Sequence, residues 1–130
     1  MRSVLALAFF LAACATTAPP SVSGEWRAAD VNGVPVAGAR PLTLSLGLDG
    51  RAGGNAGCNS FSGAYDIRSR DRIDLGPLAV TRMACEPTVM EQESRYLSIL
   101  EAAESFSRYG DGSLSIIAPD GRAIRFRRGG

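Results

Sequence analysis

The spacing of turn residues is the feature of this sequence that most limits its fold. Glycine adjoins Asn or Asp at Asn32-Gly33, Asp49-Gly50, Gly110-Asp111-Gly112 and Asp120-Gly121. These residue types tolerate the positive φ angles of tight turns, so the segments between them have room only for short strands. One stretch differs: from Pro87 to about Ala103 there is no glycine, and helix-forming residues dominate. The sequence therefore predicts many short antiparallel strands and a single helix.

Individual segments fit this outline. Residues 25–38 read as a strand, a turn at Asn32-Gly33 and a short return. In residues 42–48, leucine alternates with Thr, Ser and Gly, which predicts a strand with one buried face that includes Leu42, Leu44, Leu46 and Leu48. Two or three short strands are expected within 62–81, and further strands near 105–109, 113–118 and 122–127. The expected fold class is α+β, a small antiparallel β-barrel-like curled sheet packed against one α-helix.

The helix has an expected start and an expected buried face. Thr88 followed by Glu91 fits a capping box. The apolar face is expected to carry Val89, Tyr96, Leu97, Leu100 and Ala103.

The N-terminus has the layout of a secretory signal. A positive start is followed by the apolar run 4–11 and by small residues. The run is too short to span a bilayer, which needs about 20 apolar residues. The sequence "LAAC", residues 11–14, looks like a bacterial lipobox, which implies cleavage before Cys14 and acylation of that residue. An ordinary cleaved signal with an incidental cysteine is the alternative.

These features divide the chain into a lipoprotein signal peptide (1–13), a flexible tether with the lipidated Cys14 (14–23), and one folded domain (24–128). Without the signal, 13 Arg balance 13 acidic residues, so attachment to a membrane would rely on acyl chains. We expect an outer-membrane lipoprotein that faces the periplasm, a monomer, and no nucleic-acid partner.

Several kinds of catalytic site are excluded by composition. The chain contains no His and no Lys, which rules out Ser-His-Asp, Cys-His and Ser-Lys systems and Schiff-base chemistry. Two cysteines without His make a poor zinc site. The glycine-rich "GGNAGCNSFSG" precedes no predicted helix, so we interpret its glycines as bends in a curved sheet rather than a phosphate cradle. We expect a protein that is not an enzyme and has no cofactor or metal.

Three motifs in order resemble a known family. They are "GCNSFSGAY" (57–65), "LAVTRMAC" (78–85), and Met90 with Glu93, Leu97 and Leu100. Together they resemble the META domain of the heat-shock lipoprotein HslJ family over nearly all of residues 24–127. The resemblance implies a barrel-like fold packed on one helix. It also implies an envelope role linked to stress, drug tolerance and motility, without established catalytic residues. Its structural signature here comprises Gly57, Asn59, Phe61, Gly63, Tyr65, Thr81, Arg82, Met90 and Glu93.

Physical roles follow for part of this signature. Asn59 suits a tight bend in which backbone groups need partners, and Phe61 and Tyr65 are spaced for packing on one strand. Glu93 lies on the apolar side of the helix and needs a partner. Arg82 is the candidate, either as a structural pair or because both residues line a ligand groove.

The three cysteines are expected to divide by role. If Cys14 is acylated, Cys58 and Cys85 remain as an even set in an oxidising compartment, and we predict a disulfide between them. Two buried free thiols or a reactive redox pair are the alternatives.

The expected function is a lipid-anchored, non-enzymatic envelope protein that supports outer-membrane integrity or stress and drug tolerance. The alternative is a carrier for a lipid or a peptide, similar to a pilot lipoprotein; a hydrolase or inhibitor is a third candidate. An apolar cavity for an acyl chain would favour the carrier, whereas a filled core would favour an interaction module.

Overall fold

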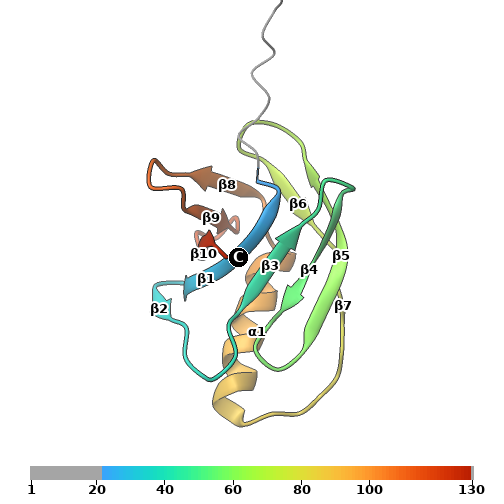
Figure 1. Ribbon diagram of the computed structural model, residues 1–130, viewed down its shortest axis with the longest axis vertical. Coiled ribbons are helices and arrows are strands. Elements are labelled where there is room, and N and C mark those ends of the chain that lie inside the picture. The colour runs from blue at the N-terminus through green and yellow to red at the C-terminus, as the bar shows by residue number, and fades with distance from the viewer. Residues whose placement is uncertain (1–21, 130) are drawn as a thin grey trace, which may run out of the picture.

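The computed structural model describes residues 22–129. The predicted signal peptide and Cys14 therefore lie outside the described residues. Within them, ten antiparallel strands form a nearly closed, barrel-like sheet, and one helix, α1 (Pro87–Glu101), packs against it (Figure 1). The predicted α+β fold class is confirmed.

The strands follow one another around the sheet in a simple order. The first part of the chain gives β1 (Gly24–Val31), β2 (Val34–Pro35), β3 (Thr43–Leu46), β4 (Arg51–Asn55), β5 (Ser60–Ile67), β6 (Ile73–Leu75) and β7 (Ala79–Val80). After α1 come β8 (Ser105–Arg108), β9 (Leu114–Ile117) and β10 (Ala123–Arg128). The hydrogen-bonded order is β6-β5-β4-β3-β1-β10-β9-β8, with β2 on β1 and β7 on β5.

The two end strands of this order come close together. An isolated bridge joins Arg72 to Ser105, the Ile73 N–H donates to the Glu104 carbonyl, and the Phe106 N–H donates to the Asp71 carbonyl. These contacts connect β6 to β8 and nearly close the barrel, which leaves few unpaired edges.

The interior of the sheet is filled by side chains. The largest fully buried ones include Trp26 of β1, Phe126 of β10 and Tyr96 of α1, all at most 1% exposed. The rings of Phe61 and Phe126 each make an edge-to-face contact with Tyr96. The Tyr96 hydroxyl donates to the Thr43 carbonyl, and burial raises the pKa of Tyr96 well above its usual value. The helix therefore supplies Tyr96, the aromatic residue that contacts both Phe61 and Phe126, to a core that it shares with the sheet.

The structure corrects two details of the predicted elements. Leu48 is 94% exposed, because β3 ends at Leu46 and residues 47–50 form the turn. The helix has Pro87 in its first turn and Glu86 at the N-cap position, with no side-chain cap hydrogen bond. The predicted capping box is therefore wrong: Thr88 lies inside the helix, because Pro87 provides the favoured residue for its first position.

The packed region begins slightly earlier than the predicted domain boundary at Gly24. Val22 is 4% exposed, and its carbonyl accepts a hydrogen bond from the Trp26 indole. The Arg128 guanidinium donates to the Ser23 carbonyl and lies over the Trp26 ring. The last two residues of the predicted tether are thus held against the barrel.

Candidate functional site

A disulfide connects the turn before β5 to the segment before the helix. Cys58 and Cys85 are bonded, with their Cα atoms 6.0 Å apart, as the sequence predicts. Cys58 is 1% exposed, so the bond ties the exposed segment 81–86 to the body of the sheet. This anchor fixes one wall of the site described below.

Glu93 holds the turn before β5 in place. Its carboxylate is 4% exposed, and Oε1 accepts hydrogen bonds from the backbone N–H groups of Cys58 (3.1 Å) and Asn59 (2.6 Å). The other oxygen, Oε2, accepts one from the Asn59 side-chain amide at 2.7 Å. A carboxylate can be buried when such donors replace water.

Asn59 extends this network to the segment before the helix. Its Oδ1 accepts from the Met83 N–H (2.6 Å) and from the Thr81 hydroxyl (2.9 Å), and its amide donates to the Met83 carbonyl (3.1 Å). The Thr81 hydroxyl also accepts from the Ser60 N–H. Asn59 thus satisfies backbone groups, as predicted, and it does so for a segment more than 20 residues away in the sequence.

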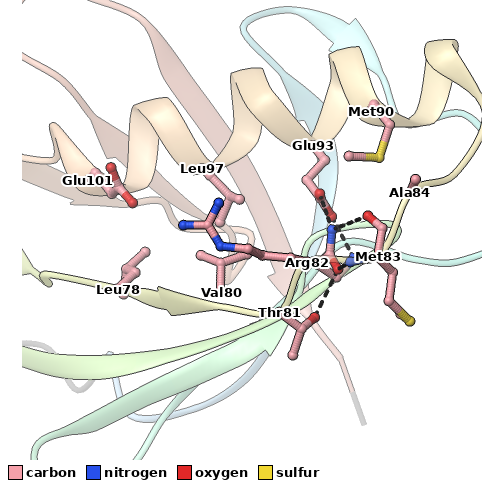
Figure 2. A pocket seen from close by; sticks show the side chains of 11 residues that line it. Leu78, Val80, Thr81, Arg82, Met83, Ala84, Met90, Glu93, Leu97 and Glu101 are labelled. Atoms are coloured by element: carbon pink, nitrogen blue, oxygen red, sulfur yellow. Dashed lines mark hydrogen bonds between the residues drawn. The ribbon is translucent and has the colours of Figure 1, made fainter.

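The predicted pairing of Arg82 with Glu93 is wrong. In the described part of the chain Arg82 forms no ion pair or hydrogen bond, and its side chain is exposed. Figure 2 shows it extending along α1 toward Leu97 and Glu101, away from Glu93. The physical reason is that Asn59 and two backbone N–H groups already occupy the carboxylate.

The remaining signature residues pack where backbones approach closely. A Cβ added at Gly63 would lie 2.6 Å from the Pro77 carbonyl oxygen, so only glycine lets β7 lie against β5. Gly57, at φ +112°, faces Leu42 and the helix. Phe61 is buried, and the half-buried Tyr65 donates its hydroxyl to the Gly47 carbonyl. The pKa of Tyr65 is raised by desolvation and by the nearby Asp49 carboxylate.

The network lies at one end of an open groove of about 520 Å³ between β7 and α1. We call it the β7–α1 groove (Figure 2). It is lined by Asn59, Leu78, Val80, Thr81, Arg82, Met83, Ala84, Met90, Glu93, Leu97 and Glu101. Five of the nine signature residues lie here: Asn59, Thr81, Arg82, Met90 and Glu93. The structure brings these five together, whereas Gly57, Phe61, Gly63 and Tyr65 serve the sheet.

Some lining residues are not candidates from sequence reasoning. The sequence predicts Leu78 and Val80 only as part of a short strand. It predicts no role for Met83, which is 53% exposed. All three residues belong to the motif "LAVTRMAC" (78–85), which follows the cis Gly76-Pro77 bond, and this motif is the sequence signal that could have identified them.

The chemistry of the groove suits binding. Glu93 is held by three donors and points into the network, which leaves Glu101 as the carboxylate of the groove lining without such donors. The walls are apolar at Leu78, Val80, Met90 and Leu97, and Arg82 and Glu101 supply opposite charges at one end.

In residues 22–129, no helix is long and apolar enough to cross a membrane.

Comparison with known proteins supplies a family and a fold. A family model described as META domain matches residues 20–129. An NMR structure of a protein from Burkholderia xenovorans is similar with a TM-score of 0.65 and 24% sequence identity, covering 82% of each chain. A second NMR structure has the same TM-score and identity and covers 80% of this chain and 87% of its own. At this identity the likeness concerns the fold alone. No curated protein matches the chain.

Proposed function

This chain belongs to the META domain family, the family of HslJ-like proteins, and from that premise we propose that it is a lipid-anchored, non-enzymatic protein of the cell envelope. It supports outer-membrane integrity under stress by binding partners at its surface.

The filled interior of the barrel carries this proposal. A lipid carrier of this size needs an apolar cavity inside the sheet, of several hundred Å³. Trp26, Tyr96 and Phe126 occupy that space together with the aliphatic core residues. The observation favours an interaction module that uses its outer surface over a carrier that encloses an acyl chain.

Two further features support an envelope location. The sequence "LAAC" at residues 11–14 has the form of a lipobox after an apolar run. The bond between Cys58 and Cys85 is of the kind that persists in oxidising compartments such as the bacterial periplasm.

Anchoring is tested by Cys14→Ser. The wild-type protein should fractionate with membranes and carry acyl groups on residue 14 by mass spectrometry, whereas the variant should be soluble or unprocessed. A wild-type chain that lacks acyl groups at residue 14 would refute the lipid anchor.

The cellular role is tested in a strain without the gene. That strain should be more sensitive to detergent and heat, and the wild-type gene should restore resistance while Cys14→Ser does not. Unchanged sensitivity of the deletion strain would refute a role in envelope integrity.

A further inference from the structure

One strand beside the groove has an unoccupied edge. β6 and β7 pair with the same side of β5, one after the other. The outer side of β6 is joined to β8 through Arg72 and Ser105. In the described part of the chain, β7 pairs only with β5, so its outer edge faces the β7–α1 groove.

The pairing pattern shows which backbone groups this edge offers. The Thr81 N–H donates to the Ser60 carbonyl at 3.0 Å, so Thr81 directs its backbone groups toward β5. In an antiparallel strand the backbone N–H and C=O groups of successive residues point alternately to the two sides of the strand. Val80, opposite Phe61, therefore directs its N–H and C=O toward the groove. Such groups are a template for an added strand.

The length and walls of the groove suit an extended chain. From Met90 to Glu101 the helix rises about 16 Å, at about 1.5 Å per residue, which equals about five residues of strand. Leu78 and Val80 on one wall and Leu97 on the other offer apolar contacts for alternate side chains. The disulfide and the Asn59 network hold segment 81–86 before anything binds, which lowers the ordering cost of binding.

Charge selects among the possible occupants. Arg82 extends along the groove toward Leu97 and Glu101 but forms no ion pair with Glu101 or with any other residue of 22–129, so its guanidinium is available to a carboxylate of the occupant. Residues 1–21 of this chain contain no Asp or Glu. Residues 77–84 of a second copy, which include β7, contain no Asp or Glu, so that strand would leave Arg82 without a carboxylate. A segment of a different protein meets the requirement.

We propose that the β7–α1 groove binds an extended, acidic-apolar peptide segment of another envelope protein. The segment adds a strand at Val80, packs alternate apolar side chains against Leu78 and Leu97, and pairs a carboxylate with Arg82. This inference rests on the proposed function and names the kind of partner that it requires.

The test uses oxidised protein purified from the envelope in detergent and fluorescence anisotropy. The probes are fluorescein-labelled, end-blocked hexapeptides in which Val, Leu or Ile alternates with Thr, and one Thr position carries Glu, Gln or Lys. We expect saturable binding in the micromolar range, tightest for the Glu series. Absence of saturation for every peptide at about 1 mM would overturn the proposal.

Variants at Val80 test the strand pairing. Val80→Pro removes the N–H that faces the groove but no bond to β5, and proline is tolerated at strand edges. It should weaken binding about tenfold relative to Val80→Ala, which keeps the N–H. Thermal melts confirm that both variants fold. Equal binding by the two folded variants would show that the edge is not used.

Variants at the charged end test the carboxylate. Arg82→Gln should weaken binding of the Glu peptides about threefold, the size expected for one exposed ion pair, and leave the Gln peptides unchanged. Glu101→Gln should not weaken either series. Equal effects of Arg82→Gln on both series, or matching losses from the two variants, would refute the pairing. Membrane attachment through Cys14 is measured separately, so loss of peptide binding with attachment retained refutes this inference alone.

Discussion

Glu93 is a buried carboxylate stabilised by N–H groups instead of a cation. Its two oxygens accept three hydrogen bonds, all from Cys58 and Asn59 in the turn before β5. A helix residue thus closes a turn that lies 34 residues earlier in the chain. Because the donors have no other partner in that turn, the helix and the turn stabilise each other.

Replacing Glu93 with Ala should lower the free energy of unfolding by about 3–5 kcal/mol, because it leaves buried donors unsatisfied at about 1–3 kcal/mol each. The loss of unfolding free energy in Glu93→Gln should lie between zero and that of Glu93→Ala, since Gln keeps one oxygen but turns an amide toward Asn59. Glu91→Ala, an exposed position on the same helix, should cost below about 0.5 kcal/mol. Urea denaturation of the three variants measures this; equal midpoints for Glu93→Ala and Glu91→Ala would contradict it.

Gly63 allows a close approach of two strands. Gly63→Ala should destabilise by about 1–3 kcal/mol, because its Cβ would meet the Pro77 carbonyl oxygen at 2.6 Å and force β7 away from β5. Gly110→Ala is the matched control, since nothing lies within 4 Å of its added Cβ. Thermal melts of both variants give the comparison, and a loss as large for Gly110→Ala would mean that the close approach is not the cause.

The burial of Glu93 could be predicted from the sequence, but its partner could not. The helical period places Glu93 beside Tyr96 and Leu97 on the apolar face, which the structure confirms. Pairing it with Arg82 follows the rule that opposite charges attract. The actual donors are backbone groups, and their direction depends on a turn geometry that no residue pattern specifies.

Among the elements, the segment between β7 and α1 is the least regular and depends most on cross-links. Residues 81–86 form no helix or strand and are exposed. They are held by the disulfide at Cys85 and by the bonds of Asn59 to Thr81 and Met83. This segment forms a wall of the β7–α1 groove, so its order sets the shape of the groove.

Replacing both Cys58 and Cys85 with Ala should lower the free energy of unfolding by about 3 kcal/mol, because the bond closes a loop of 27 residues in the unfolded chain. Guanidinium denaturation with and without a reductant measures the effect. Reductant should lower the midpoint of the wild type to that of the double variant and leave the variant unchanged. A reductant effect of equal size on the variant would contradict the role of the bond.

Elements with strong periodicity could be predicted, and elements shaped by backbone contact could not. The alternating leucines of β3 and the glycine-free stretch of α1 identify these two elements in the sequence. The strand β4 (Arg51–Asn55) contains Gly53 and Gly54 and has no apolar alternation, so the sequence suggests bends there. Its strand conformation comes from five pairings with β5, which are tertiary contacts. The prediction that Leu48 is buried is wrong for the opposite reason. The alternation of leucines continues in the sequence to residue 48, past the point where the turn begins.

At the scale of the folded domain, residues 22–129, titration between about pH 9 and 11.5 depends on tyrosine. The chain has no His and no Lys, and Cys58 and Cys85 are bonded. The pKa of Tyr96 is raised well above 10.0 by burial, and that of Tyr65 is raised by desolvation and by Asp49. Both groups are protonated below about pH 9, in the folded and in the unfolded chain.

The free energy of unfolding should therefore fall as the pH rises above about 10. The unfolded chain loses its phenolic protons first, whereas the folded chain retains them until the pH passes the raised pKa. Tyr96→Phe should reduce this slope, and the remainder should come from Tyr65. Urea denaturation at several pH values between 8 and 11.5, about the range in which phenols titrate, measures it. An unchanged slope in Tyr96→Phe would contradict the assignment.

The pairing of β1 with β10, with Trp26 opposite Arg128, also sets an order in time. β1 can pair with β2 and β3 early, but it can pair with β10 only when residues 123–128 have been made. Until then β1 and β9 each keep an open edge, and the indole of Trp26 lacks the nearer of the two guanidinium groups that lie over its ring, that of Arg128. A chain that lacks residues 123–128 is thus incomplete beside β1, and the contact that completes it joins two segments far apart in the sequence. Pairing of β10 therefore covers the open edges of β1 and β9 together, and such edges are the sites at which strands of other chains can add.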